Sequence, residues 1–277
     1  MKDFTDNNVY IVGGSSGIGL AAGVEFAKRD ANVIVFARRK KPLVAAKERI
    51  ATHAVSGRQR FAEMNMDATE AKTVRDVFNR AIKNFGPPDI LINCAGRSIP
   101  DYFEKITEET LQEVMRVNLY ATWNAIAALL PQMKKRGGVI VNVSSIAGFL
   151  GAFGFTAYSA SKFAVIGFSE ALASEVRRYG IFVSVLCPPD TDTPGLLSED
   201  KTKPHETREL SKNAKLMTPE KVARALIRGI EKNKFMIIPG FDGKWMYHVK
   251  RLFPNLAMGI MGLMLRTIQK KMEKPIK

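Results

Sequence analysis

Tyr158 and Lys162 are the side chains of this 277-residue chain whose types and spacing best suit proton transfer. If they lie on a helix, residues four apart share one face, so the phenol and the ammonium point the same way. A neighbouring ammonium favours the phenolate and lowers the pKa of a phenol from its usual value of about 10. We therefore expect Lys162 to make Tyr158 a proton donor and acceptor near neutral pH. An ordinary helix with an unrelated Tyr–Lys pair is the alternative that this spacing alone leaves open.

Ser145 is a third candidate for chemistry because of what precedes it. Residues 139–143 read Val-Ile-Val-Asn-Val, an apolar run typical of a buried strand. Ser145 would then lie just beyond the carboxyl end of that strand, where open α/β sheets bind their ligands. Ser144 competes for the same role, but neighbouring residues of a strand point to opposite faces. The sequence therefore predicts that Ser145, rather than Ser144, faces the site.

Strand-like and helix-like segments alternate along most of the chain. Such alternation is typical of a parallel sheet covered by helices on both faces, and right-handed crossovers make it doubly wound. We predict a single α/β domain of Rossmann type with about seven strands over residues 1–243, followed by a basic amphipathic helical tail over 244–277. The predicted strands are 9–12, 32–37, 58–66, 89–93, 139–143, 181–187 and 235–238. The predicted helices are 17–29, 41–55, 69–84 with Thr69 as its cap, 107–133, one through Tyr158 and one from Thr218. The segment 190–215 is expected to be irregular with short helical pieces.

A glycine-rich turn joins the first predicted strand to the first predicted helix. Its glycines allow a tight turn in which the backbone approaches a pyrophosphate at the start of a helix. A glycine turn with a purely structural role would not need this placement, so the position indicates a dinucleotide site. The residues assigned to the cofactor here are Gly13, Ser15, Ser16, Gly17, Ile18 and Gly19.

The end of the second predicted strand indicates which dinucleotide binds. An NAD site has an acidic residue about 20 residues after the turn, where it bonds the ribose 2′-hydroxyl. Arg38 and Arg39 stand at that place, and no carboxylate does. Guanidinium groups pair with a 2′-phosphate in a bidentate manner, which favours NADP(H). A solvated basic start of the next helix is the alternative.

These residues, with further matches in the same order, resemble the classical short-chain dehydrogenase/reductase family. The resemblance covers nearly the whole chain. Val12 stands where the family has threonine and Cys94 where it has a second asparagine; neither departure affects the glycines. The matching positions are Gly13, Gly17 and Gly19 in the turn, Asp67 after the third strand, Asn93, Ala95 and Gly96 after the fourth, and Asn118, Ser145, Tyr158 and Lys162 as the catalytic tetrad.

The resemblance implies a carbonyl reduction in which NADPH supplies a hydride and Tyr158 protonates the developing alkoxide. Ser145 would bond the same oxygen, Lys162 would also bond the nicotinamide ribose, and Asn118 would hold a water that relays protons to Lys162. Asp67 would contact the adenine. The family also implies a homodimer or homotetramer formed through the long helices, including the one that bears Tyr158.

The run 188–195 narrows the substrate, because it resembles the 3-ketodihydrosphingosine reductases, which act on a long-chain 3-keto sphingoid base. Pro188 and Thr193 would contact the cofactor, Thr193 at the nicotinamide carboxamide. Asp190 or Asp192 would attract a substrate amine or would simply cap a turn. Apolar residues suited to an alkyl chain, or alternatively to the core or a subunit contact, are Phe149, Leu150, Phe153, Phe155, Leu196 and Leu197.

The expected function is therefore NADPH-dependent reduction of 3-ketodihydrosphingosine to dihydrosphingosine in sphingolipid biosynthesis. A 3-oxoacyl-carrier-protein reductase or a steroid-type ketone reductase is the alternative among enzymes. A non-catalytic NADP-sensing or scaffold protein is the alternative from another class. A pure binder has no need of a complete catalytic tetrad, so the sequence favours an enzyme.

The formal net charge of +15 indicates an anionic partner. From Lys244 onward eight residues are positive and only Glu273 is negative, on either side of the uncharged stretch 252–265. As a helix, that stretch would be about 21 Å long, short of the roughly 30 Å hydrocarbon core of a bilayer. Its apolar stripe suits a helix that lies in an anionic membrane interface, or else one that packs on the protein. We expect no nucleic-acid partner, because no basic motif interleaved with aromatics is present, and no metal site.

Both cysteines, Cys94 and Cys187, lie in apolar strand-like contexts. Buried free thiols are typical of a reducing compartment. The chain begins with Met1 and continues into a strand without an apolar signal region. We expect a cytoplasmic protein, peripheral on the cytoplasmic face of a membrane if the tail binds lipid.

Overall fold

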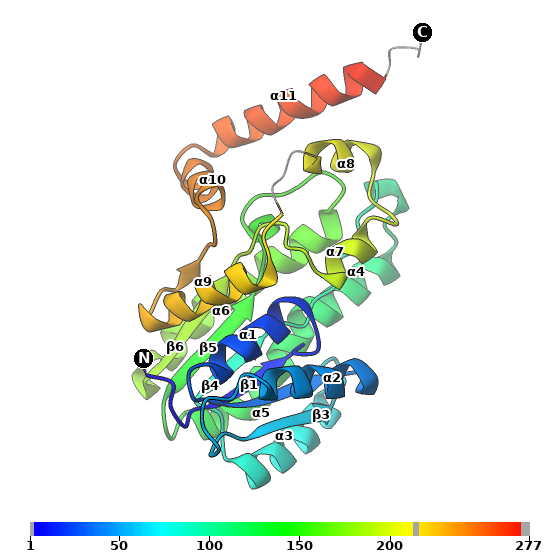
Figure 1. Ribbon diagram of the computed structural model, residues 1–277. Helices are drawn as coiled ribbons and strands as arrows, with labels where there is room; N and C mark the ends of the chain where they lie inside the picture. Colours follow the sequence, from blue (N-terminus) through cyan, green and yellow to red (C-terminus); the bar gives the residue numbers. More distant parts are fainter. Residues whose placement is uncertain (1–2, 213–215, 273–277) are drawn as a thin grey trace.

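The computed structural model describes residues 3–212 and 216–272. Seven strands form one parallel sheet in the order β3-β2-β1-β4-β5-β6-β7, which confirms the predicted fold class (Figure 1). The chain order reverses between β1 and β4, and such a reversal opens a crevice at the carboxyl ends of the strands. The strands are β1 (Asn8–Val12), β2 (Asn32–Ala37), β3 (Phe61–Asn65), β4 (Ile90–Asn93), β5 (Gly138–Val143), β6 (Ile181–Leu186) and β7 (Met236–Ile237).

Helices cover both faces of the sheet because alternate strand residues point to opposite sides. Val9 and Ile11 of β1 belong to a buried core that they share with α1, α2 and α9. Tyr10 and Val12 belong to a second buried core, shared with α3, α5 and α6. These helices are α1 (Gly17–Ala27), α2 (Lys40–Ala51), α3 (Ala71–Phe85), α5 (Ala121–Met133), α6 (Thr156–Val176) and α9 (Pro219–Glu231).

The long helix predicted over 107–133 is present but is interrupted. Thr107 caps α4 (Glu108–Met115) by accepting a hydrogen bond from the Thr110 amide at 3.2 Å. A π-helical turn over Arg116–Tyr120 then joins α4 to α5. Such turns are rare in proteins, but those that occur are often found at functional sites. This turn carries Asn118, one of the predicted catalytic residues.

Thr69 does not cap the helix that follows β3, so that prediction is wrong. Its amide and its hydroxyl both donate to Asp67 Oδ1, at 2.9 and 2.8 Å. The carboxylate thus holds the chain in a local turn, and α3 begins only at Ala71, with Glu70 at the cap position. The third strand is also shorter than the predicted 58–66, since only Phe61–Asn65 pairs with β2.

The segment 190–215 contains two short helices, α7 (Pro194–Glu199) and α8 (His205–Ser211), as predicted; residues 213–215 lie outside the described part. Side-chain hydrogen bonds tie α8 to the body of the protein. Thr207 Oγ1 donates to the Phe153 carbonyl at 2.9 Å, and the Tyr102 hydroxyl donates to Glu206 Oε2 at 2.8 Å. These bonds fix α8 over the loop that precedes α6.

Two further helices form the tail, α10 (Phe241–Leu252) and α11 (Pro254–Met272). In Figure 1, α11 lies beyond α8 and points away from the sheet. Glu273, Lys274 and Lys277, which contribute to the predicted tail charge, lie outside the described residues. One side of α11 is half-buried, at Ala257, Met261, Leu265 and Ile268. No helix in residues 3–212 or 216–272 is long and apolar enough to cross a membrane.

Candidate active site

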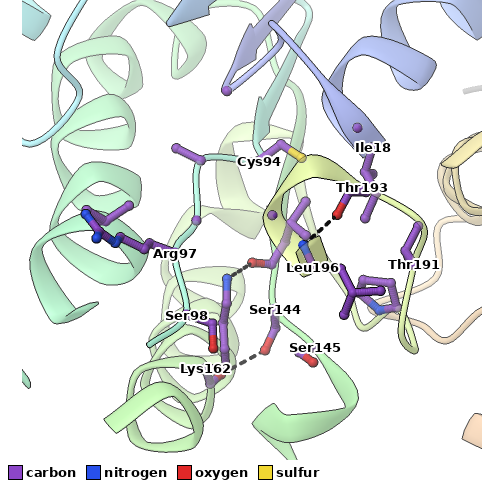
Figure 2. A pocket seen from close by; sticks show the side chains of 18 of the residues that line it. Ile18, Cys94, Arg97, Ser98, Ser144, Ser145, Lys162, Thr191, Thr193 and Leu196 are labelled. Carbon is purple, nitrogen blue, oxygen red and sulfur yellow. Dashed lines mark hydrogen bonds between the residues drawn. The ribbon is translucent and has the colours of Figure 1, made fainter. Parts of the chain in front are cut away.

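A cavity of about 910 Å³ opens at the carboxyl ends of β1, β4 and β5, where the strand order reverses. One part of it is lined by the glycine turn and the end of β2, and the other by the loops after β4, β5 and β6. Figure 2 shows several of these loops converging on the cavity. The predicted site residues that line it are Gly13, Ser15, Ser16, Gly17, Ile18, Arg38, Arg39, Asp67, Ala95, Gly96, Ser145, Tyr158, Lys162, Pro188 and Thr193.

The glycine turn is packed so closely that its glycines cannot be replaced without a shift of the backbone. Gly13 has φ +82°, and a Cβ there would lie 2.5 Å from the Ala95 amide nitrogen. A Cβ on Gly19 would lie 2.4 Å from the Gly13 carbonyl oxygen. Gly17 has φ +54° and would meet the Thr193 side chain at 2.9 Å. The start of α1, at Gly17 and Ile18, lines the cavity, which fits the pyrophosphate of a dinucleotide.

Two arginines and one aspartate lie where the adenosine end of such a dinucleotide would bind. Arg38 and Arg39 follow β2, and Asp67 follows β3. Arg38 Nη1 lies 3.9 Å from Asp67 Oδ2, and the arginine side chain is 59% exposed. The guanidinium of Arg38 is therefore accessible to a ligand.

Asn93 does not line the cavity; instead it supports the loop that does. Its Nδ2 donates to Asn142 Oδ1 at 2.9 Å, and Asn142 Nδ2 donates to Ser169 Oγ at 2.8 Å. This buried chain of polar groups links β4, β5 and α6. Asn93 Oδ1 is buried and has no hydrogen-bond partner among the described residues.

Asn118 also lies behind the cavity wall. Its Nδ2 donates to the Arg97 carbonyl at 2.9 Å and to Ser161 Oγ at 2.8 Å, while its Oδ1 accepts from the Arg97 amide at 2.8 Å. The side chain therefore clamps the loop after β4 to helix α6, and both of its polar atoms have protein partners. Ser161, which the sequence interpretation missed, is the residue on α6 that completes this clamp.

The competition between the two serines after β5 is resolved by geometry. Ser144 is buried, and its hydroxyl donates to the Lys162 carbonyl at 2.8 Å (Figure 2). Both serines line the cavity, but only the Ser145 hydroxyl lies close enough to the Tyr158 phenol to lower the pKa of that phenol. Of the two hydroxyls, that of Ser145 is therefore the one on the side of the tyrosine.

The predicted effect of Lys162 on the pKa of Tyr158 is not found. Burial raises the pKa of the Tyr158 phenol above its usual 10, and the Glu199 and Asp190 carboxylates act in the same direction. Burial also lowers the pKa of Lys162, to about 8. Lys162 Nζ lies 5.7 Å from the centre of the tyrosine ring and donates to the Val143 carbonyl at 2.9 Å. Desolvation therefore outweighs the attraction between the two side chains, and the phenol is protonated at neutral pH.

Thr193 and Pro188 close the cavity on the side of β6. Thr193 caps α7, since its Oγ1 accepts from the Leu196 amide at 3.3 Å (Figure 2). The same side chain lies against Gly17 of the glycine turn. The loop after β6 and the turn after β1, far apart in sequence, are therefore joined at the middle of the cavity.

Only part of the predicted apolar lining is correct. Leu150, Phe155 and Leu196 line the cavity, together with Ile146 and Met246, which the sequence interpretation did not include. Phe149 is instead buried against Tyr247 of α10, with ring centres 5.3 Å apart. Phe153 packs edge-on against Tyr102, and Leu197 is 66% exposed. Further polar residues of the lining that were missed are Arg97, Ser98 and Glu199.

The fold and the cavity define a Rossmann-type oxidoreductase with a tyrosine, a lysine and a serine at its centre. Comparison with known proteins identifies the family. Residues 7–204 match the family model described as short chain dehydrogenase. The chain belongs to the short-chain dehydrogenase family, and it is an oxidoreductase that depends on a nicotinamide dinucleotide.

Several curated relatives are named as reductases of one sphingoid ketone, called 3-ketodihydrosphingosine or 3-dehydrosphinganine. The chain is 40% identical to a 3-ketodihydrosphingosine reductase of Mus musculus over 238 residues, which are 85% of this chain and 72% of the relative. It is 39% identical over 242 residues to the 3-dehydrosphinganine reductase TSC10B of Arabidopsis thaliana, covering 85% of this chain and 70% of that one.

Solved structures agree in fold. A short-chain dehydrogenase/reductase from Burkholderia phymatum in complex with NAD has a TM-score of 0.81 at 20% identity, covering 92% of this chain and 96% of that one. Actinorhodin polyketide ketoreductase with NADPH has a TM-score of 0.73 at 24% identity, covering 85% and 96%.

Proposed function

We propose that this protein reduces the 3-keto group of 3-ketodihydrosphingosine with NADPH and releases dihydrosphingosine. The relatives that share 39 to 40% of its sequence are named for this substrate. The observation that carries the proposal is the cluster of Ser145, Tyr158 and Lys162 in a cavity that has basic side chains at one end and apolar walls at the other. Such a cavity suits a dinucleotide phosphate beside an alkyl ketone.

The roles of the chain's own groups follow from their protonation and position. The bound dinucleotide supplies a hydride to the carbonyl carbon. Tyr158, protonated at neutral pH, donates its proton to the carbonyl oxygen as negative charge develops there, and Ser145 donates a hydrogen bond to the same oxygen. Lys162, with a pKa of about 8, carries a positive charge at neutral pH beside the phenolate that the transfer leaves behind. Its ammonium would also bond the nicotinamide ribose.

NADPH rather than NADH is proposed because of the end of β2. Arg38 and Arg39 line the cavity there, and the Arg38 guanidinium is exposed. The carboxylate of Asp67, at 3.9 Å from Arg38, is too far for a short hydrogen bond and leaves the fork of the guanidinium available to a 2′-phosphate. The other residues that the sequence assigns to the cofactor are proposed to contact it here as well. Asn93 would act indirectly, because it supports the loop that lines the cavity.

Turnover by the purified chain tests the proposal. NADPH oxidation is followed with 3-ketodihydrosphingosine, with a 3-oxoacyl thioester and with a steroid ketone. We expect consumption with the sphingoid ketone and at least about a thousandfold loss of kcat for Tyr158→Phe, with NADPH affinity kept. Turnover of the thioester alone would overturn the substrate assignment, and full activity of Tyr158→Phe would overturn the proton donor.

We further propose that the tail, residues 244–277, is a membrane-binding unit attached to a catalytic domain of residues 1–243. Phe241, Trp245 and Leu252 share one face of α10 and are 78%, 55% and 67% exposed. Leu256 and Leu263 are 55% and 64% exposed on α11. Apolar faces this open, next to basic residues, are typical of helices that lie in an anionic interface. The two free cysteines are consistent with the cytoplasmic face of a membrane.

Vesicle binding tests this membrane surface. Sedimentation with phosphatidylcholine vesicles that contain phosphatidylserine should recover the wild-type chain, and high salt should reduce recovery. The double variant Trp245→Ser/Leu263→Ser should lose binding, whereas the control Val55→Ser, at a 60% exposed site far from the tail in sequence, should not. Equal binding by all three proteins would assign the apolar faces to another partner.

The proposed homo-oligomer is supported by exposed aromatic side chains on the π-helical turn, on α5 and on α6. Tyr120 and Trp123 are 53% and 57% exposed, and Phe163 of α6 is 44% exposed. Exposed aromatics of this density are typical of subunit contacts. Trp123→Glu should lower the mass of the protein measured by sedimentation. A wild-type protein that sediments as a monomer would refute the proposal.

A further inference from the structure

Glu199, the last residue of α7, is a mostly buried carboxylate in the substrate half of the cavity. Its side chain is 16% exposed and lines the cavity together with Tyr158 and Ser98. None of the hydrogen bonds described above for Asn118, Ser145, Tyr158 and Lys162 involves Glu199. The proposed proton transfer does not use it either. A buried carboxylate so close to a reacting centre requires a role or a partner.

The partners of Glu199 within the protein are weak. The nearest cation is Lys203, whose Nζ lies 3.9 Å from Glu199 Oε2 but 2.9 Å from Asp200 Oδ1. No hydrogen bond to the Glu199 carboxylate is formed by any residue in 3–212 or 216–272. The Ser98 hydroxyl is near enough to act on its pKa, yet Ser98 Oγ is buried and has no hydrogen-bond partner among those same residues. Within the described residues, a carboxylate without a direct hydrogen bond and a hydroxyl without a partner therefore line the same cavity.

Two carboxylates contribute to this end of the cavity although the chain as a whole is basic. The chain carries a net charge of +15, yet Glu199 and Asp190 line the cavity with Tyr158. Of the cations in the lining, Arg97 is paired with Glu113 and Lys162 donates to the Val143 carbonyl. Burial raises the pKa of Glu199 to about 7, with Asp190 and Asp200 adding to the rise and Lys203 and Ser98 opposing it. A cation bound here would relieve that unfavourable desolvation and hold the carboxylate ionised.

We propose that Glu199, with the Ser98 hydroxyl, binds the ammonium group of a long-chain amino ketone and so selects substrates that carry a primary amine next to the reacting carbonyl. The inference rests on the proposed function and adds the residue that recognises the polar end of the substrate. The apolar walls at Leu150, Phe155 and Met246 would take the alkyl chain, which leaves the amine on the side of Glu199. An ammonium donates up to three hydrogen bonds, which the carboxylate and the serine oxygen can accept.

Glu199 is better placed than the two aspartates indicated by the sequence. Asp192 is exposed and does not line the cavity, and its amide is bound to the Met217 carbonyl at 2.9 Å. Asp190 lines the cavity but is exposed to solvent, where an ion pair is screened and weak. Only Glu199 combines a place in the cavity with low exposure, and a charge-assisted bond is strongest where water is excluded.

A pair of ketones that differ only in the amine tests the inference. Kinetics with NADPH are measured for 3-ketodihydrosphingosine and for the analogue that lacks only the 2-amino group, with wild type, Glu199→Gln and Asp192→Asn. Asp192 is the matched control, because it is a nearby exposed carboxylate that does not line the cavity. For Glu199→Gln we expect kcat/KM to fall at least about tenfold on the amino ketone, mainly through KM, and to stay within about twofold on the analogue. Asp192→Asn should behave as wild type on both ketones.

Equal losses on both ketones, or none on either, would overturn the assignment. Binding of dodecylamine against dodecanol, measured as the shift in Tm of the NADPH complex, separates this inference from the proposed function. Wild type should prefer the amine and Glu199→Gln should not. If wild type prefers dodecylamine but turns over neither ketone, the proposed reaction is wrong and the ammonium site stands. If wild type shows no preference for the amine, the ammonium site is wrong whatever the turnover.

Discussion

The charge of Glu199 should destabilise the fold at alkaline pH, and removing it should stabilise the protein. The pKa of this carboxyl is 4.5 for an ordinary glutamate and about 7 in the folded protein. The folded protein therefore binds the proton of Glu199 more tightly than the unfolded chain does. This contribution to stability is fully present below pH 4.5 and is lost as pH rises through 7. One pKa unit corresponds to about 1.4 kcal/mol, so above pH 8 the ionised side chain lowers the free energy of unfolding by about 3 kcal/mol.

Glu199→Gln keeps the shape of the side chain and cannot ionise. Its free energy of unfolding should match that of wild type at pH 5 and exceed it by about 3 kcal/mol at pH 8.5. Lys203 keeps its ion pair with Asp200 at 2.9 Å, so the substitution does not leave a buried cation alone. For a chain of this length, the difference corresponds to roughly 6 °C in Tm.

Urea unfolding of the cofactor-free protein, followed by tryptophan fluorescence at pH 5, 7 and 8.5, measures the effect. Asp192→Asn, at an exposed carboxylate that does not line the cavity, is the control and should show no gain that grows with pH. A difference between Glu199→Gln and wild type that is the same at all three pH values would refute the reasoning, because the expected difference arises only when Glu199 ionises. A variant less stable than wild type at pH 8.5 would show that the carboxylate is satisfied inside the protein.

Three further substitutions follow from the geometry of the site. Arg38→Ala should weaken NADPH binding at least about tenfold while leaving NADH binding nearly unchanged, as read from nucleotide fluorescence titrations; equal effects on both would place the 2′-phosphate elsewhere. Gly19→Ala places a Cβ 2.4 Å from the Gly13 carbonyl oxygen, so the turn must open and both nucleotides should bind at least about tenfold more weakly in the same titration. Asn118→Ala leaves the Arg97 backbone and Ser161 without their partner, and we expect about 1–3 kcal/mol of lost stability in urea unfolding together with a lower kcat; an unchanged stability would mean that water replaces the side chain.

Much of this architecture follows from local pattern. The strands are continuous apolar runs, the glycine turn is fixed between a strand and a helix, and Tyr158 and Lys162 are related by one helical turn. These features depend on residues close in sequence, so sequence alone predicts them. The choice of Ser145 over Ser144 also follows, because it depends only on the alternation of a strand.

What the sequence could not supply depends on contacts between distant segments. The protonation of Tyr158 reflects its burial in the folded protein, which reverses the effect expected from Lys162. Asn118 acts as a clamp because a π-helical turn directs it at Arg97, and no residue pattern indicated that turn. Glu199 lies in a segment without regular spacing, and its low exposure arises only when α7 packs over the cavity.

The two sides of helix α10 lie in different environments. Met246 is part of the cavity wall, while its neighbour Trp245 is 55% exposed on the surface proposed to meet lipid. A single residue step thus separates the cavity from the surface proposed to bind the membrane. Removal of the tail is therefore expected to lower activity even in detergent, because the cavity wall loses the Met246 side chain.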